Sequence, residues 1–415
     1  MPLSRRTFVG AVLGAPLAGE AVLDATRAAS PGGAREHVVV VGAGAFGGWT
    51  ALALRRAGLR VTLVDAWGAG HARASSGGET RVIRAVYGGL PEYVAMAARA
   101  LALWRAEERR LGRRVLVRTG ALWLCAGDDG YVRRSVEPVR AAGLPIDELS
   151  LDEARRRWPQ VRLDDVRTVF HEPEAGFLLA RLACELVREA FVREGGSWRQ
   201  AAVRPVVADG ARLGRVRLED GGTLAADRFV FACGPWMGRI LPEVIGRRIV
   251  ATRQEVFFFG TPAGDPRFDV GALPAWVHMG ERLVYGLPSH ERRGLKVADD
   301  TAGDEVDPTT LERVPGAGGV ARAREIVRAR FPAMADAPVV ESRVCQYEAS
   351  SDGDFLVDRH PTLADVWLVG GGSGHGFKMG PALGEHVAAL VRGRATLVPR
   401  FAYARLRPRP EARAG

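Results

Sequence analysis

The sequence has few of the residues from which disulfide frameworks and metal sites are built. Its 415 residues contain four cysteines and eight histidines. The cysteines form no CxxC pair and the histidines are scattered without ligand spacing, so we expect neither a disulfide framework nor a metal site. We also find no internal repeat. The composition, 47% hydrophobic and 26% charged, is that of a globular protein with room for two domains.

The chain also lacks a hydrophobic run long enough to cross a membrane, so we expect no integral membrane association. The Gly/Ala-rich stretch that reaches Leu23 is interrupted by Pro16 and Glu20. It follows Ser4–Val9, Ser-Arg-Arg-Thr-Phe-Val, which resembles a twin-arginine export signal. We therefore predict residues 1–33 to be a signal and linker, and the protein to be exported to the periplasm or the exterior. A frayed N-terminus on a cytoplasmic protein is the alternative.

Positive charge exceeds negative charge, with 58 Lys and Arg against 48 Asp and Glu and a pI near 10.1. Arginines are spread along the whole chain, and aromatic residues do not interleave with them. We therefore expect no nucleic-acid partner, because an anionic cofactor or substrate explains the excess as well. The stretch from Arg400 to Arg413 predicts a solvated basic tail, which we place at residues 401–415.

Two glycine-rich turns, one near each end of the chain, are the most informative features. The first joins the apolar run 38–41 to Gly42-Ala43-Gly44-Ala45-Phe46-Gly47, and the second joins 366–369 to the glycine-rich run 370–378. Each turn leads into a helical pattern, so it aims backbone N–H groups and a helix N-terminus at an anion. Two such turns suggest a dinucleotide held at both ends, with its reactive ring under the later turn.

The first turn lies in a predicted β-α-β unit of strand 38–41, helix 46–57 and strand 60–64. Asp65 ends this unit 23 residues after Gly42, near the spacing at which an acid meets a ribose hydroxyl. The dinucleotide-binding residues predicted here are Gly42, Gly44, Gly47 and Asp65. Further along, we predict helices at 92–110 and 181–193, strands at 203–207, 216–218, 228–232, 255–259 and 282–287, and a loop-rich stretch at 301–319.

Six further motifs occur in chain order: Gly77–Arg84 with Tyr87, Tyr285–Pro288, Gly294–Lys296, Val344–Tyr347, Asp354–Asp358 and Ser373–Lys378. Together they resemble the monomeric sarcosine oxidase and N-methyltryptophan oxidase family of D-amino-acid-oxidase-like flavoproteins, from about residue 37 to 400. The resemblance implies FAD, attached through the sulfur of Cys345 to the flavin 8α-methyl group. It also implies oxidation of a secondary amine of an amino acid.

The expected fold class is α/β, with a discontinuous Rossmann-like FAD-binding domain and a second α+β substrate domain built on a large mixed sheet. We expect a monomer. The predicted FAD-binding domain comprises residues 34–117, 176–247 and 353–400. The predicted substrate domain comprises residues 118–175 and 248–352.

Several residues are implied as flavin contacts. Cys345 would need a nearby cation to become a thiolate, and Arg343 or a distant basic residue could supply it; a buried structural cysteine is the alternative. Residues 374–377 would place N–H groups near flavin N1 and C2=O, where negative charge grows on reduction. The further cofactor contacts are Thr80, Val203, Gly234, Gly374, Gly376 and Phe377.

Other residues are implied at the substrate. Arg84 and Lys378 resemble the pair that holds the substrate carboxylate; a lysine opening a helix opposes the macrodipole, which favours anion binding over a solvated lysine. Arg81 resembles the arginine over the flavin ring, and Lys296 the lysine that meets dioxygen. Tyr285 resembles an active-site tyrosine. A salt-bridged surface lysine and core packing are the alternatives for Lys296 and Tyr285.

Asp300 and Gly77 stand where the family's sarcosine oxidases carry histidines. An acid beside a substrate ammonium raises the pKa of the amine and keeps it charged, whereas hydride transfer needs the free amine. An additional positive group on the substrate would account for Asp300. We count Asp300 with Arg81, Lys296 and Tyr285 as the candidate catalytic residues.

The predicted function is an FAD-dependent amine oxidase that converts a secondary amino acid, N-methyl or cyclic, to an imine and reduces O2 to hydrogen peroxide. One alternative is a flavin dehydrogenase that passes electrons to another acceptor. A second is a non-catalytic flavoprotein. A monooxygenase would need a docking feature for NAD(P)H, and we find none.

Overall fold

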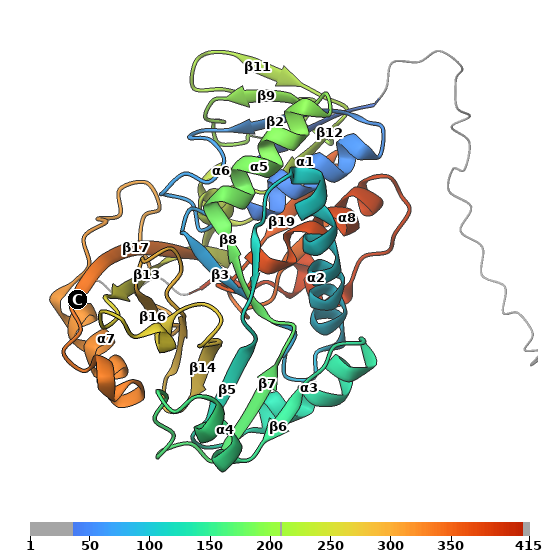
Figure 1. Cartoon of the computed structure of the whole chain (residues 1–415). Coiled ribbons are helices and arrows are strands. Elements are labelled where there is room, and N and C mark those ends of the chain that lie inside the picture. The colour runs from blue at the N-terminus through green and yellow to red at the C-terminus, as the bar shows by residue number, and fades with distance from the viewer. Residues whose placement is uncertain (1–35, 208–209, 410–415) are drawn as a thin grey trace, which may run out of the picture. The chain divides into compact units, whose positions relative to one another are not determined.

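The computed structural model describes residues 36–207 and 210–409, and Figure 1 shows how their helices and strands are arranged. The predicted export signal lies outside these residues. No helix within the described ranges is long and apolar enough to cross a membrane.

Parallel pairing of apolar strands builds the first sheet, whose order is β18-β19-β12-β1-β2-β9. All neighbouring strands pair in parallel except β18 and β19. The four valines of β1 are at most 6% exposed, because helices cover a parallel sheet on its faces. The strands are β1 (His37–Val41), β2 (Arg60–Asp65), β9 (Ser197–Gln200), β12 (Arg228–Phe231), β18 (Leu356–Arg359) and β19 (Val366–Gly370).

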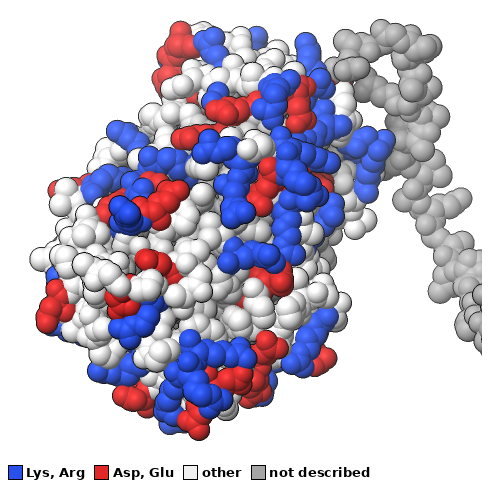
Figure 2. Space-filling view, in the orientation of Figure 1, with Lys and Arg blue, Asp and Glu red and all other residues white. Residues whose placement is uncertain are grey.

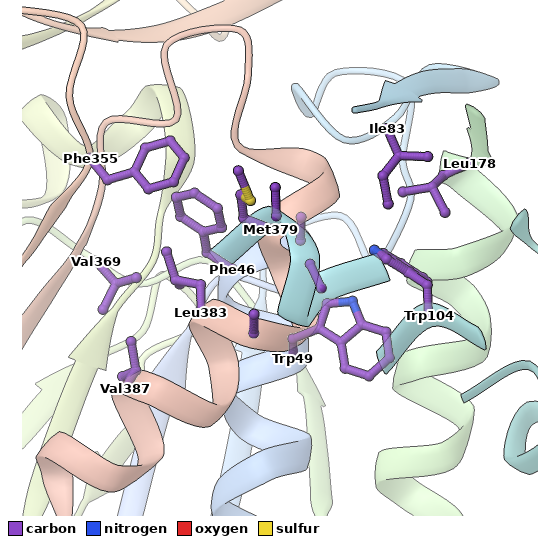
Figure 3. Close-up of a cluster of buried hydrophobic side chains, with 14 of the residues drawn as sticks. Phe46, Trp49, Ile83, Trp104, Leu178, Phe355, Val369, Met379, Leu383 and Val387 are labelled. Atoms are coloured by element: carbon purple, nitrogen blue, oxygen red, sulfur yellow. The ribbon is translucent and has the colours of Figure 1, made fainter. Parts of the chain in front are cut away.

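Aromatic and branched side chains join the helices to this sheet. Helix α1 packs against α8 and α5, and α2 packs against α8. Figure 3 shows Phe46 of α1 beside Leu383 of α8, and Trp49 of α1 beside Trp104 of α2. The helices are α1 (Ala45–Arg56), α2 (Pro91–Leu111), α5 (Ala180–Arg193) and α8 (Gly380–Val391).

A mixed sheet of eight strands forms the second layer system, in the order β17-β13-β16-β15-β14-β5-β7-β6. Only β14 and β5 pair in parallel. The strands are β5 (Ala121–Cys125), β6 (Asp147–Leu149), β7 (Thr168–Glu172), β13 (Ile249–Phe259), β14 (Ala275–Met279), β15 (Leu283–Leu287), β16 (Leu295–Asp299) and β17 (Val339–Ser350).

Smaller elements complete the described chain. A three-stranded sheet holds β3 (Thr80–Ile83), β8 (Gly176–Leu179) and β4 (Leu116–Arg118), and a hairpin holds β10 (Arg215–Arg217) and β11 (Thr223–Ala225). The other α-helices are α3 (Gly130–Ala141), α4 (Leu151–Arg157), α6 (Met237–Ile240) and α7 (Ala317–Arg330). The 3-10 turns are Gly234–Trp236, Gly246–Arg248, Pro266–Phe268, Pro332–Met334, Phe377–Met379, Pro399–Phe401 and Tyr403–Arg405.

The predicted helices at 46–57, 92–110 and 181–193 are confirmed as α1, α2 and α5 within one residue at each end. Every strand of the six-stranded sheet lies in the ranges predicted for the FAD-binding domain. Every strand of the eight-stranded sheet lies in the ranges predicted for the substrate domain. The domain boundaries themselves stay a prediction.

Two local predictions are wrong. Residues 203–207 form no strand, since only Val203 pairs, with Leu218, and Pro205 cannot donate to a ladder. Residues 401–409 are not a solvated tail, because Phe401 is 0% and Leu406 is 3% exposed. An arginine of this segment also forms an ion pair with an acid elsewhere in the chain. Arg405 pairs with Asp352.

Surface arginines lie among acids on the face shown in Figure 2. Arg133, for example, contacts Asp129 at 2.7 Å and Glu148 at 2.9 Å. Such pairs neutralise local positive charge.

Candidate active site

Two cavities share a wall made of Arg81, Tyr347, Gly374 and Phe377. The first has a volume of about 510 Å³ and lies at the carboxyl ends of β1, β2, β12 and β19. The second has a volume of about 400 Å³ and is lined from β5, β14, β15 and the second glycine-rich turn. A molecule in one cavity therefore meets a molecule in the other across this wall.

The first glycine-rich turn makes an anion site in the first cavity. Gly42 has φ 104°, and a Cβ there would lie 2.2 Å from the oxygen of Ala232. Helix α1 begins after Gly44 with no side-chain cap and no acid in its first turn. Ala45 N donates to Ser76 Oγ at 3.1 Å, so the helix dipole and the N–H groups of the first turn beyond Ala45 are what α1 offers an anion.

The carboxylate of Asp65 stabilises this turn through hydrogen bonds. Its Oδ2 accepts a 2.8 Å hydrogen bond from Ala43 N, and its Oδ1 accepts 2.9 Å bonds from Trp67 N and Gly68 N. Asp65 also lines the first cavity. The carboxylate thus holds the backbone in place, a role that the spacing rule alone did not predict. Its contact with a ribose stays a prediction.

The other predicted cofactor contacts divide into two groups. Gly47 packs under the turn, since a Cβ there would lie 1.9 Å from Gly42 O, and Thr80 accepts from Lys296. Neither Gly47, Thr80 nor Cys345 lines a cavity. The predicted contacts that line the first cavity are Gly42, Gly44, Asp65, Val203, Gly234, Gly374, Gly376 and Phe377.

Cys345 faces the guanidinium of Arg81 and not that of Arg343. Nη2 of Arg81 lies 3.3 Å from the sulfur, and the same group donates to the carbonyls of Thr80 and Ser75. Arg343 instead pairs with Glu79 and Glu341. Of the two predicted sources of a cation beside Cys345, the distant basic residue is therefore the one in place.

Arg84 and Lys378 line the second cavity together. Arg84 donates to Val86 O and stacks on Tyr87, 4.5 Å from the ring centroid. Nζ of Lys378, a residue only 4% exposed, donates to Tyr87 Oη at 2.9 Å and to His375 O at 2.7 Å. Neither cation has an ion-pair partner among the residues described, so an anion is the missing partner.

Burial lowers the pKa of Lys378 well below its ordinary value, and the charge of Arg84 lowers it further. Lys378 lies in the 3-10 turn Phe377–Met379, ahead of α8. The prediction that it opens a helix is therefore wrong. Its charge is opposed by burial and by Arg84, and a bound carboxylate would relieve both.

Asp300 brings an acid into the same cavity. Tyr347 Oη donates to its Oδ1 at 2.6 Å. Burial raises the pKa of this carboxyl, while the hydrogen bond from Tyr347 and the charges of Arg84 and Lys378 oppose the rise. Arg84, Lys378 and Asp300 in one cavity match the opposite charges of an amino-acid zwitterion. Gly77, the other departure, lies outside both cavities.

Lys296 is buried, so the surface salt-bridge alternative is wrong. It lies on β16, is 2% exposed, and its Nζ donates to Thr80 O at 3.0 Å. Burial and the nearby Arg81 lower its pKa to about 7. Nζ lies 5.7 Å from the ring centroid of Tyr285, which lines the second cavity.

Sequence reasoning missed two signals. Lys296 and Lys378 are the only lysines in 415 residues, in a chain that otherwise uses arginine. Both are buried at the candidate site, so lysine usage alone could have found them. Tyr347 and Glu348, which line the first cavity, were also missed as site residues, although they follow Cys345 on β17.

Comparisons with known proteins show which family and which fold the chain resembles. The model of a family described as FAD dependent oxidoreductase matches residues 37–390. Monomeric sarcosine oxidase of Bacillus sp. (strain B-0618) is 29% identical over 360 residues, which cover 85% of this chain and 91% of the relative. N-methyl-L-tryptophan oxidase of Yersinia pestis (strain Pestoides F) is 28% identical over 360 residues, which cover 85% and 94%.

Solved structures share the fold. L-proline dehydrogenase from P. horikoshii has a TM-score of 0.76 at 20% identity, covering 90% of this chain and 98% of that one. Fructosyl amine:oxygen oxidoreductase from Aspergillus fumigatus has a TM-score of 0.76 at 19% identity, covering 92% and 91%. Together with the family match, these structures confirm the predicted fold class, and the family match confirms FAD as the cofactor.

The cation pair predicts a carboxylate site whose affinity depends on pH. A simple carboxylate such as acetate should perturb the flavin absorbance, and Lys378→Met should weaken its binding about 10- to 150-fold, the loss of a charge-assisted contact of roughly 1.5–3 kcal/mol. Because the pKa of Lys378 is lowered, affinity should fall as pH rises, well before pH 10.5. Arg392→Met, at the residue directly after the C-terminal end of α8, is the control and should leave the dissociation constant unchanged. Equal affinity in wild type and Lys378→Met would rule out this site.

Proposed function

Because the chain belongs to the FAD-dependent oxidoreductase family, we propose that it oxidises a secondary amino acid, N-methyl or cyclic, to an imine and transfers the electrons to O2. The bound flavin supplies the chemistry, taking a hydride equivalent from the amine and reducing O2 to hydrogen peroxide. One observation carries the proposal: a cavity that holds Arg84, Lys378 and Asp300 abuts the cofactor cavity across Arg81 and Tyr347.

The residues of the first cavity fit FAD. The start of α1, with its dipole and the N–H groups of its first turn beyond Ala45, suits the pyrophosphate, and Asp65 lines the same cavity. At the other end, Gly374 and Gly376 approach side chains so closely that a Cβ would lie 2.6 Å from Tyr347 and from Phe46, respectively. Backbone there can reach a ligand that a larger residue would exclude, which suits the flat edge of the flavin.

In the second cavity, Arg84 and Lys378 hold the substrate carboxylate. Asp300 then faces the nitrogen side of the zwitterion, with Tyr347 fixing the orientation of its carboxylate. The substrate nitrogen must lose a proton before oxidation, and a buried acid with a raised pKa accepts one more readily than an exposed acid does. A second positive group on the substrate would occupy Asp300 instead.

Lys296 supports O2 as the acceptor. Its Nζ is held by Thr80 without a carboxylate partner, so its charge is available to stabilise the anion formed when O2 takes an electron. We further propose that Cys345 carries the flavin covalently, because Arg81 lies against its sulfur. Export by the twin-arginine motif of residues 4–9 and a monomeric state complete the proposal.

The activity itself is tested by an anaerobic screen. We expect N-methyl or cyclic amino acids to bleach the flavin without air, because the carboxylate and amine fit the second cavity, and we expect one hydrogen peroxide per turnover when air is admitted. Absorbance and a peroxide assay provide the measurements. Bleaching without peroxide would assign the protein to the dehydrogenases. No bleaching by any amine would leave the non-catalytic alternative.

Lys296→Met should slow reoxidation of the reduced flavin by O2 about 100-fold or more while leaving reduction by substrate nearly unchanged. In the wild type the lysine is charged below its pKa of about 7, so the reoxidation rate should fall as pH rises through 7. Stopped-flow mixing of reduced enzyme with O2 measures this rate. Lys378→Met is the matched control, with the opposite pattern: slow reduction and normal reoxidation. A pH-independent wild-type rate would contradict the role of Lys296.

Cys345→Ala should release its flavin. Wild-type protein precipitated by acid or detergent should stay yellow, whereas the precipitate of Cys345→Ala should be colourless with FAD in the supernatant. Cys233→Ala, whose thiol lines the first cavity but faces Val41 O at 3.7 Å, should behave like the wild type. Colour retained by the Cys345→Ala precipitate would refute the linkage.

A further inference from the structure

A buried glutamate lines the first cavity without a partner for its charge. Glu348 lies near the end of β17 and is 7% exposed. Its Oε2 accepts one long hydrogen bond, 3.5 Å from Gly372 N. Its Oε1 is buried and has no hydrogen-bond partner among the described residues. A buried carboxylate in this position is costly, and the neutral acid is favoured.

Neighbouring elements bring little that would stabilise a negative charge. The second glycine-rich turn covers Glu348 closely, since a Cβ on Gly370 would lie 2.3 Å from Oε1 and one on Gly372 would lie 3.8 Å from Oε2. Burial raises the pKa of Glu348 to about 7, opposed only by backbone N–H groups of Gly371 and Gly372. Phe46 of α1 lines the same cavity and brings no charge.

The other titratable or charged residues that line this cavity are Asp65, His71, Arg81, Glu219, Cys233, Arg239 and Tyr347. None of their side chains is among the causes that shift the pKa of Glu348. Cys233 and Asp65 are the ones whose charges are coupled to this region. The thiol of Cys233, after β12, has a pKa raised by burial and by the nearby charges of Glu348 and Asp65. Asp65 lies at the end of β2, where its carboxylate accepts hydrogen bonds from backbone N–H groups. Both groups are acids, so neither offers Glu348 a counter-charge.

A bound dinucleotide adds more negative charge. The pyrophosphate site at the start of α1 belongs to the same cavity as Glu348. Anions that share a low-dielectric cavity repel one another, so a phosphate there favours the protonated form of the acid. A protonated carboxyl is also a donor, and the phosphates and ribityl hydroxyls of FAD are acceptors.

We infer that Glu348 binds FAD as a neutral acid, so that binding of the cofactor takes up one proton from the solvent. The carboxylate gains the proton, and the new O–H donates to an oxygen in the chain that joins the flavin ring to the adenosine. This inference rests on FAD occupying the first cavity, as the proposed function requires.

Proton uptake makes the affinity for FAD depend on pH. Below the pKa of the free protein Glu348 is already protonated, and binding exchanges no proton. Above that pKa, each unit of pH should weaken binding up to tenfold, because Glu348 must take up a proton on binding and the proton concentration falls tenfold per pH unit. The linkage therefore predicts a constant dissociation constant below about pH 6 and a rising one above pH 7.

The test uses the full chain with Cys345→Ala, so that FAD binds reversibly whether or not the wild type is covalent. FAD is titrated into the flavin-free protein from pH 6 to 9, and calorimetry at pH 8 in two buffers of different ionisation heat counts the protons. We expect uptake close to one proton and a 10- to 100-fold loss of affinity between pH 7 and 9. A flat dissociation constant with no uptake would overturn the inference.

Adding Glu348→Gln, which keeps the shape and a donor without titrating, should remove both the uptake and the slope. Adding Cys233→Ser instead should preserve both the proton uptake and the pH dependence of the dissociation constant. The assignment to Glu348 would be overturned if the pH dependence persisted in the Glu348→Gln variant or disappeared in the Cys233→Ser variant. A titration with ADP, which lacks the ribityl chain, shows which oxygen accepts the hydrogen bond from Glu348. If the dissociation constant of ADP depends on pH, the acceptor is a phosphate. If only that of FAD does, the acceptor is a ribityl hydroxyl. Failure of FAD to bind a folded protein would instead sink the proposed function.

Discussion

Buried positive charge held by backbone carbonyls, not by carboxylates, is the constraint on which this centre depends. Arg81 donates to Thr80 O and Ser75 O, Lys296 to Thr80 O, and Lys378 to His375 O. A carbonyl orients a cation and partly solvates it but does not neutralise it. The charges therefore remain available to anionic groups.

The fold supports this constraint by bringing two strands to one wall. Strand β3 carries Thr80 and Arg81, and Arg84 follows it directly. Strand β17, from the eight-stranded sheet, carries Cys345, Tyr347 and Glu348. Where these strands meet, the first and second cavities share their wall. A shift of either strand would separate the sulfur from its guanidinium and would move Tyr347 out of both cavities.

Acids are used sparingly at this centre, and burial moves their pKa values upward. The pKa of Asp300 rises in the second cavity, and the pKa of Glu348 rises to about 7 in the first cavity. The pKa of Lys296 falls to about 7. Each of these groups can change its protonation when charge arrives or leaves nearby. Proton movements are thereby tied to the binding of the ligands that the fold admits.

Much of the fold could be read from local patterns. The β-branched run 38–41 and the glycines after it determine a strand, a turn and a helix within a few residues, and the structure has all three. The same local rule failed at residues 203–207, where Pro205 removes a donor, and at 401–409, where apolar Phe401 and Leu406 are buried in spite of their arginine neighbours.

The sequence by itself determined which residue types are present for a flavin and an amino acid: the two turns, a cysteine, and the cations. Only the tertiary structure decided which of them face one another. Arg81 lies 264 positions from Cys345 and yet contacts it, whereas Arg343, two positions away, is held by Glu79 and Glu341. Burial of Lys296 and the unpartnered oxygen of Glu348 are likewise products of long-range packing. Local spacing carries no information about such contacts, because they form between strands that meet only when both sheets are in place.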